Sequence, residues 1–137
     1  MSPNTTTSTD STAADAPGAG TAPVAWFEIA GPDMAALEGF YADVFGWKFA
    51  DSPMGASYRI ADNGGLSGGL TSSEDGLPAH YAIFSLQVAD VAATCETISA
   101  AGGSVLLGPA ETPMGLVYAN VTDPAGNHLG LFSAPAG

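Results

Sequence analysis

The sequence is poor in cations, and this shortage excludes several kinds of partner. Lys48 and Arg59 are the only lysine and arginine, against 14 aspartates and glutamates, and the formal net charge is −12. Binding to nucleic acid or to an anionic membrane needs clustered Lys or Arg, so we expect neither partner. The acidity is compatible with a cationic or neutral small molecule, although it also serves solubility alone.

Cysteine and long apolar runs are scarce as well. The single cysteine, Cys95, cannot form an internal disulfide and fits a reducing compartment. No stretch approaches the roughly 18 apolar residues of a membrane helix. Residues 1–22 lack apolar periodicity and predict a disordered tail, without the basic and apolar regions of a secretory signal. We therefore expect a cytoplasmic protein with one domain over residues 23–134.

The sequence does contain an internal repeat. Asp33 and Asp90, 57 residues apart, each open a predicted helix. An apolar, strand-like run precedes each helix, and a glycine and a second strand follow it. Two such copies imply two similar halves, and halves of this kind tend to enclose a site between them.

Apolar periodicity and turn residues predict a βαβββ order in each copy. In the first, about residues 23–72, the expected strands and helix are Val24–Ile29, helix Asp33–Phe45, Trp47–Ala50, Ser57–Ala61 and Leu66–Leu70. In the second, about residues 79–134, they are Tyr81–Val88, helix Asp90–Ala101, Ser104–Leu107, Leu116–Thr122 and His128–Phe132. Asp33 is suited to cap the first helix and Gly46 to end it.

Alternation along the strands separates two faces of the sheet. One face is uniformly apolar and is expected to pack against the helices. The other mixes aromatic residues with Glu, Gln, Asn, Thr and His, which is typical of a ligand cavity. The alternative is a partly solvated sheet face.

Three segments resemble the vicinal oxygen chelate superfamily, which includes glyoxalase, bleomycin-resistance proteins and extradiol dioxygenases. They are Trp26–Ile29, Phe40–Trp47 and the turn Asp123–Asn127. The resemblance covers about residues 23–134 and implies an α+β fold in which two βαβββ modules form an open β-cup. It also implies that a second chain can complete the cups, and we expect a homodimer.

The sequence departs from this family at the positions of its metal ligands. Metal-dependent members carry His or Glu where this chain has Val24, Ile83 and Gly130, and no carboxylate or imidazole lies near Leu66–Leu70. Apolar side chains and glycine cannot bind a divalent ion. The resemblance therefore implies a metal-free member without a cofactor, and it argues against glyoxalase and dioxygenase chemistry.

Glu28 is the strongest candidate for a functional residue. It lies at the centre of its strand beside Trp26, and apolar surroundings raise the pKa of a carboxyl group toward a range useful for proton transfer. A salt bridge to Arg59 or Lys48, or an exposed strand edge, would be a purely structural alternative. His128 and Tyr118 are the expected partners of Glu28 in acid–base catalysis, although a histidine after a turn is often simply exposed to solvent.

Other residues of the mixed face are expected to contact a ligand. The expected ligand-binding set is Trp26, Glu28, Tyr58, Ser85, Gln87, Asn120 and Phe132. Each of them is equally compatible with an ordinary structural role. The aromatic residues of the first helix and its end are expected in the core, as is Cys95, whose burial disfavours a nucleophilic role.

Two functions are consistent with these features. The first is metal-independent binding of a small, aromatic, antibiotic-like molecule, either cationic or neutral, as in drug sequestration. Glu28 would face the positive group of a cation, and Trp26 and Phe132 would stack on a ring. The alternative is a metal-free lyase, isomerase or cyclase that acts on a secondary-metabolite intermediate with Glu28 as acid or base. A third possibility is a structural domain with a vestigial cup, since one scaffold hosts many functions.

Overall fold

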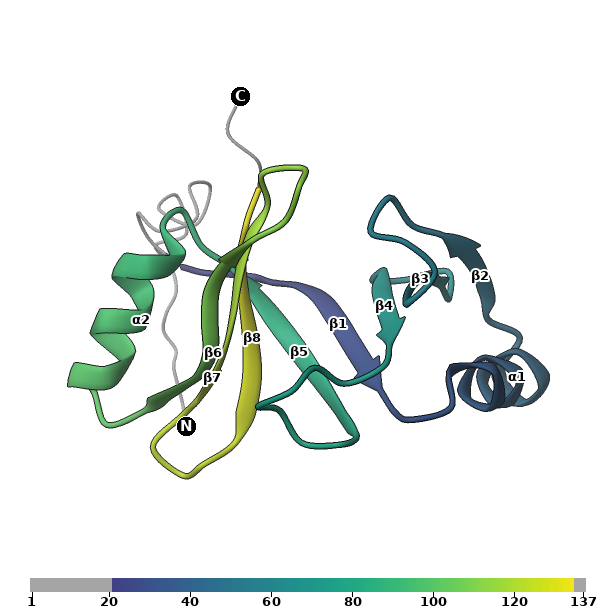
Figure 1. The fold of residues 1–137 in the computed structure, drawn as a ribbon, viewed down its shortest axis with the longest axis horizontal. Helices are drawn as coiled ribbons and strands as arrows, with labels where there is room; N and C mark the ends of the chain where they lie inside the picture. Colours follow the sequence, from purple (N-terminus) through teal and green to yellow (C-terminus); the bar gives the residue numbers. More distant parts are fainter. Residues whose placement is uncertain (1–20, 135–137) are drawn as a thin grey trace, which may run out of the picture.

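The fold is one eight-stranded mixed sheet with two helices, as seen in a computed structural model that describes residues 21–134 (Figure 1). The strands are β1 (Val24–Ala30), β2 (Lys48–Asp51), β3 (Tyr58–Asp62), β4 (Gly68–Thr71), β5 (Tyr81–Gln87), β6 (Ser104–Glu111), β7 (Val117–Thr122) and β8 (His128–Ser133). The helices are α1 (Met34–Phe45) and α2 (Val91–Ala100). The expected disordered tail, apart from its last two residues, lies outside the described residues.

The strand order shows how the two halves of the chain meet. It is β2-β3-β4-β1-β5-β8-β7-β6. The N-terminal half contains β1, α1 and β2–β4, and the C-terminal half contains β5, α2 and β6–β8. Within the halves β1 pairs in parallel with β4, and β5 pairs in parallel with β8. Because β1 and β5 pair antiparallel at the centre, both halves of the cup come from the same chain.

Local sequence signals set the helix ends. The Asp33 carboxylate accepts a hydrogen bond from the Ala36 amide at 3.0 Å, and Asp90 caps α2 through the Ala93 amide, also at 3.0 Å. Gly46, at φ 74°, takes the left-handed conformation that ends α1. The expected caps are thus confirmed. Strand β6 is longer than expected and runs to Glu111, because it pairs with β7 through two register shifts that accommodate its glycine and proline.

A cluster of buried residues lies between α2 and the C-terminal half of the sheet. Its members are Val88, Val91, Cys95, Ala119, Val121 and Leu131. Apolar residues that recur along α2 meet alternate residues of β7 and β8, so helical and strand periodicities converge on one cluster. The expected burial of Cys95 is confirmed, and burial raises the pKa of its thiol.

Helix α1 is packed differently from α2, and the expectation that its aromatic residues are core is wrong for two of them. Phe40 is 51% exposed and Phe45 is 60% exposed. The helix lies at the β2–β4 end of the sheet, and none of its residues is fully buried (Figure 1). Its rings pack mainly on one another and on Trp47, whose ring centroid is 4.7 Å from that of Tyr41. An aromatic surface is left open on α1.

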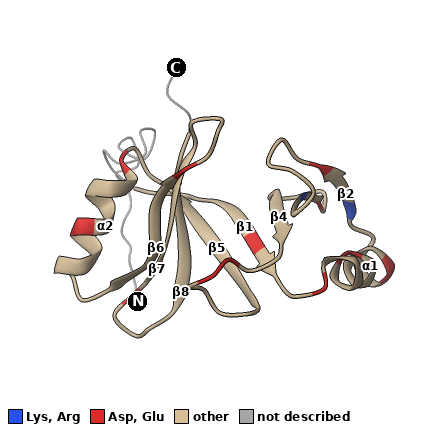
Figure 2. Ribbon diagram, in the orientation of Figure 1, with Lys and Arg blue, Asp and Glu red and all other residues tan. Residues whose placement is uncertain are grey.

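Charge is distributed unevenly along the fold. Acidic residues are spread over helices, strands and loops, whereas the two basic residues lie on β2 and β3 at one end of the molecule (Figure 2). Neither helix in the described part of the chain has the length and apolar content that a membrane crossing requires.

Candidate functional site

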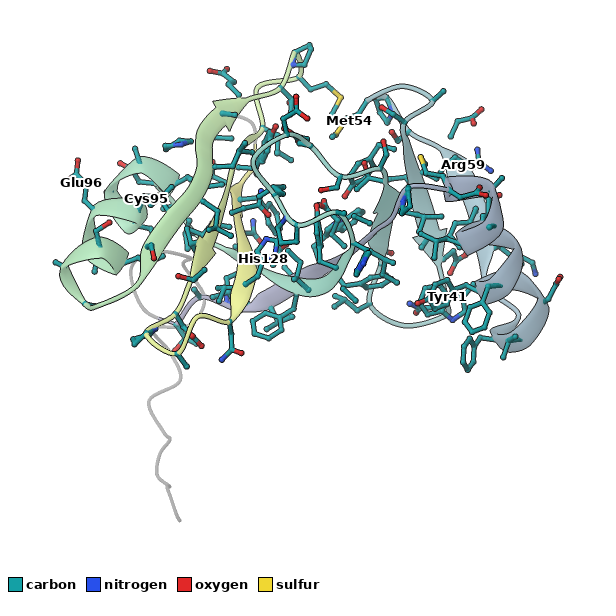
Figure 3. All side chains as sticks on the ribbon, turned by 60° about the horizontal axis from the view of Figure 1, so that its bottom comes forward. Tyr41, Met54, Arg59, Cys95, Glu96 and His128 are labelled. Carbon is teal, nitrogen blue, oxygen red and sulfur yellow. The ribbon has the colours of Figure 1, made fainter. Side chains whose placement is uncertain are left out.

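A cavity of about 340 Å³ opens on the mixed face of the sheet and takes its walls from both halves of the chain. Six of the seven residues expected to bind a ligand line it, together with Tyr118: they are Trp26, Glu28, Tyr58, Ser85, Asn120 and Phe132. Gln87, at the end of β5, is not among the lining residues. His128, which is labelled in Figure 3, does not line the cavity either, and its ring contacts Asn120. The alternation of side chains along the strands therefore predicted most of the residues expected in the cavity wall correctly.

Glu28 lies at the centre of a hydrogen-bonded network of aromatic residues. The Tyr58 hydroxyl donates to its Oε1 at 3.0 Å, and the Tyr81 hydroxyl donates to its Oε2 at 2.5 Å. Trp26 Nε1 donates in turn to the Tyr58 hydroxyl at 2.8 Å. Tyr81 was not expected in the site, although it lies on the same alternating face of β5 as Ser85. The network holds the carboxylate in one orientation.

Burial governs the protonation of this network. Desolvation raises the pKa of Glu28, and the hydrogen bonds from Tyr81 and Tyr58 oppose that shift only in part. Burial, followed by the nearby Glu28 charge, raises the pKa of both tyrosines far above its usual range. The phenols therefore stay protonated as donors, and Glu28 is the group of the network that titrates.

A glycine makes room for this network. Gly69 pairs with Glu28 on β1 and with Ile60 on β3. A Cβ at Gly69 would lie 2.0 Å from the Tyr58 hydroxyl oxygen and 2.1 Å from its Cζ. Only a residue without a side chain allows the Tyr58 ring to cross β4 and reach Glu28.

A second carboxylate lies at the mouth of the cavity. Glu74 belongs to the loop between β4 and β5, is exposed and lines the cavity. The Tyr118 hydroxyl donates to its Oε2 at 3.1 Å. Burial and the Glu74 charge raise the pKa of Tyr118 to about 12. Sequence reasoning missed Glu74, because nothing in a loop sequence shows which wall the loop will reach.

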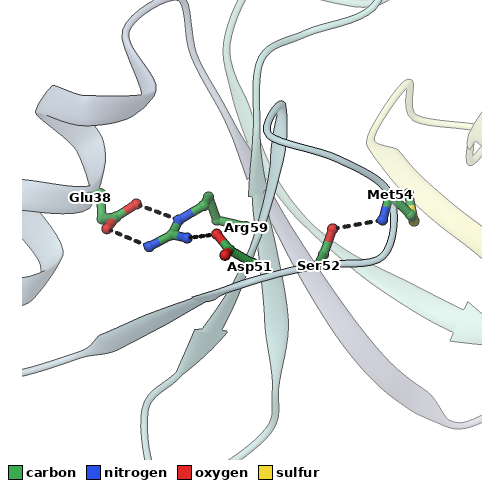
Figure 4. Close-up of polar contacts among 5 residues, drawn as sticks. All are labelled: Glu38, Asp51, Ser52, Met54 and Arg59. Atoms are coloured by element: carbon green, nitrogen blue, oxygen red, sulfur yellow. Dashed lines mark hydrogen bonds and ion pairs between the residues drawn. The ribbon is translucent and has the colours of Figure 1, made fainter.

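Arg59 does not neutralise the site. Its guanidinium bonds to Glu38 through Nε at 3.0 Å and Nη2 at 3.1 Å, and to Asp51 at 2.5 Å (Figure 4). None of these three residues lines the cavity. The structural alternative of a Glu28–Arg59 salt bridge is therefore wrong, and no Lys or Arg occurs among the described residues that line the cavity.

His128 contacts two residues that line the cavity. Its Nε2 lies 2.9 Å from Asn120 Oδ1, and its ring meets Tyr81 edge to face at a centroid distance of 4.7 Å. Its Nδ1 is buried and has no partner among the described residues. Burial lowers the pKa of His128, which favours the neutral ring.

The residues of the cavity do not form a metal site of a familiar kind. In the part of the chain that the structure describes, no three His, Cys, Asp or Glu side chains are grouped so that they would hold an ion. Two of the positions matched to the family's ligands, Ile83 and Gly130, do line the cavity. Their side chains offer no metal ligand, so the donor set present does not fit such a metal.

Comparison with known proteins agrees with this architecture. Residues 24–131 match the family model of the glyoxalase/bleomycin resistance protein/dioxygenase superfamily. The chain is 26% identical over 117 residues to the putative glyoxylase CFP32 of Mycobacterium tuberculosis, a match that covers 80% of this chain and 44% of that protein. The chain thus spans less than half the length of this curated relative.

Solved structures share the fold at low identity. A methylmalonyl-CoA epimerase from Mycobacterium tuberculosis has a TM-score of 0.54 at 15% identity, over 82% of this chain and 87% of that one. A hypothetical protein from Bacillus halodurans has a TM-score of 0.59 at 14% identity, over 86% and 98% of the two chains. The strand order and the cavity are those of a protein in which two βαβββ modules form one cup, and the family match agrees with this class. The chain belongs to the glyoxalase/bleomycin resistance protein/dioxygenase superfamily, and the resemblance noted from its sequence is confirmed.

Proposed function

We propose that the cavity binds a small, largely apolar organic cation without the help of a metal, in the manner of a sequestering protein. The observation that carries this proposal is the charge of the cavity wall. Glu28 lies inside and Glu74 lies at the mouth, and among the described lining residues there is no Lys or Arg to balance them. A buried carboxylate without a counter-charge is costly. A bound cation would supply the missing partner.

The remaining wall supports an aromatic or apolar ligand body. Trp26, Phe132, Met54 and Met114 offer rings and flexible thioethers, and the volume of about 340 Å³ suits a drug-sized molecule or a part of one. A ring of the ligand can stack on Trp26 while its positive group approaches Glu28.

The same charges disfavour anionic substrates. An acyl-coenzyme A carries several negative charges, and in this cavity it would face Glu28 and Glu74 without a cation nearby. The fold shared with methylmalonyl-CoA epimerase therefore does not by itself extend that enzyme's substrate to this chain.

A charge series on one ring tests the proposal. We expect tryptamine, a cation, to bind more tightly than neutral tryptophol and far more tightly than anionic indolepropionate, by roughly tenfold or more at each step. Isothermal titration of the three compounds at neutral pH measures this order. Equal affinities, or tightest binding of indolepropionate, would contradict the proposal.

One observation favours the enzymatic alternative, a lyase, isomerase or cyclase. The raised pKa of Glu28 suits a general acid or base, and proton transfer by a positioned carboxylate contributes roughly 10²- to 10⁴-fold to a rate. Its partner would be Tyr118, on the opposite wall, because the His128 ring is turned toward Asn120. Conversion of a bound ligand, abolished in Glu28→Gln, would establish this alternative. Binding without conversion supports sequestration.

We also propose a homodimer, formed through the open surface of α1. Both halves of one chain contribute residues to the cavity wall. The exposed rings of Phe40 and Phe45, next to Val44, which is 58% exposed, form an apolar surface that association of two copies would cover. The mass of the native assembly in solution tests this proposal, and a monomer would contradict it.

A further inference from the structure

The C-terminal half of the cavity repeats the glycine arrangement of the N-terminal half with different chemistry. Ser85 follows Glu28 by the same 57 residues that separate the two helix caps. Gly130 pairs in parallel with Ser85, as Gly69 pairs with Glu28. A Cβ at Gly130 would lie 2.4 Å from Ser85 Oγ, so the hydroxyl leans over the glycine backbone. Where one half presents a carboxylate, the other presents a hydroxyl.

Asn120 flanks the same glycine on the other side. It pairs with Gly130 across β7 and β8, so Ser85, Gly130 and Asn120 form one row across three strands. Asn120 is only 5% exposed and Ser85 is 8% exposed, yet both line the cavity. No hydrogen bond of Asn120 Nδ2 or Ser85 Oγ occurs among the described residues, and neither atom is sealed from the cavity. Two buried residues of the cavity wall thus have polar atoms without a hydrogen-bond partner among the described residues.

His128 determines which polar atom Asn120 presents. In one arrangement, His128 Nε2 carries the hydrogen and donates it to Asn120 Oδ1. The buried His128 Nδ1, which has no partner among the described residues, is then an unprotonated acceptor, and the N–H₂ group of Asn120 faces the cavity. In the opposite arrangement, Asn120 Nδ2 would donate to Nε2 and His128 Nδ1 would carry a buried hydrogen without an acceptor. Orphaned buried N–H groups are rarer than under-used acceptors. The first arrangement is therefore the favoured one.

We propose that Asn120 Nδ2 and Ser85 Oγ form a donor subsite for an oxygen acceptor of the ligand, such as a ketone or amide carbonyl. His128 is a positioning residue that acts through Asn120. This inference rests on the proposed binding function and adds a second requirement to the ligand. A ligand that binds to both halves of the cavity carries a positive group that contacts Glu28. On its other side it carries a carbonyl oxygen that accepts hydrogen bonds from Asn120 Nδ2 and Ser85 Oγ.

A matched pair of neutral probes tests the subsite apart from the cation site. Acetophenone and α-methylstyrene have nearly the same shape, but one carries C=O where the other carries C=CH₂. We expect Ser85→Ala and Asn120→Asp each to weaken acetophenone binding by roughly three- to tenfold while leaving α-methylstyrene binding unchanged. The Asp variant keeps an acceptor for His128 and replaces the amide N–H₂ donor with a carboxylate oxygen. It also adds a negative charge, and α-methylstyrene, which has no oxygen acceptor, shows how much that charge alone disturbs the cavity. Titrations followed by NMR measure all affinities.

The histidine has its own pair of variants and its own readout. We expect His128→Leu to reduce the preference for acetophenone over α-methylstyrene, as Asn120→Asp does. We expect His128→Gln to retain that preference, because the Gln amide can donate to Asn120 Oδ1. Nitrogen NMR of the wild-type protein should show the Nε2–H form of His128. If both probes bind in the cavity but Ser85→Ala leaves their ratio unchanged, the subsite is refuted while the proposed function stands. If neither probe binds and tryptamine also fails, both are refuted.

Discussion

Glu28→Gln is expected to lower the affinity for tryptamine by roughly 10- to 100-fold, because a hydrogen bond or ion pair with a charged group contributes about 1.5–3 kcal/mol in a partly buried site. The substitution keeps the shape of the side chain and one acceptor for the two phenols, so the affinity for neutral tryptophol should change little. Isothermal titration of both ligands separates loss of charge from loss of the cavity.

Glu96→Gln is the matched control for this substitution. It removes the same charge from an exposed position of α2 that does not line the cavity (Figure 3). Its tryptamine affinity should equal that of the wild type. Equal losses in the two variants would mean that overall charge, and not Glu28, attracts the cation.

The raised pKa of Glu28 gives the same variant a pH signature. At pH values between the pKa of Glu28 in the unfolded chain and its higher pKa in the folded protein, Glu28 binds more protons in the native state than in the unfolded chain. Its contribution to the free energy of unfolding is therefore full below the pKa of the unfolded chain. That contribution is lost as pH rises through the pKa of the folded protein. Glu28→Gln removes this loss, and its stability relative to wild type should rise with pH across that window. Urea unfolding at several pH values measures the difference. Tryptamine affinity of the wild type should rise over the same window, because the carboxylate forms there.

Gly69→Ala is expected to destabilise the protein by about 1–3 kcal/mol and to weaken tryptamine binding as well. The added methyl group cannot coexist with the Tyr58 ring in its present place, since its carbon would lie 2.0 Å from the hydroxyl oxygen. Tyr58 would have to leave both Glu28 and Trp26, which costs two hydrogen bonds. Urea unfolding and titration with tryptamine measure the two effects.

Gly39→Ala provides the comparison for this glycine. Gly39 lies within α1, and a Cβ there would meet no atom within 4 Å. Alanine is favoured over glycine in a helix by roughly 1 kcal/mol, so this variant should be as stable as wild type or more stable. A Gly69→Ala protein with wild-type stability and affinity would show that Tyr58 does not need the space above Gly69.

The sequence predicted those features that depend on neighbouring residues. The Asp33 cap, the glycine at the end of α1 and the alternating faces of the strands are local signals. The alternation placed Glu28, Tyr58, Ser85 and Asn120 on the mixed face of the sheet. The expected order of strands and helices followed from the same signals. Alternation does not tell how far along a strand a cavity extends, and Gln87 therefore lies beyond its edge.

Features that depend on long-range packing were harder to foresee. The contact of Tyr81 with Glu28 joins residues 53 positions apart, and the loop of Glu74 reaches Tyr118 from a different half of the chain. The aromatic residues of α1 were expected in the core, but the sequence could not show that this helix would lie at one end of the sheet, with Phe40 and Phe45 open. A local pattern shows that a face is apolar, but not what covers it.

Native mass spectrometry of the full chain, purified from its own host, shows whether the cavity holds an organic cation. We expect the mass of the protein plus an organic molecule that contains a basic nitrogen and a carbonyl oxygen, and we expect Glu28→Gln to lose that molecule. A transition metal bound at one per chain, with no organic adduct, would contradict the proposed function and would return metal-dependent chemistry to this cavity.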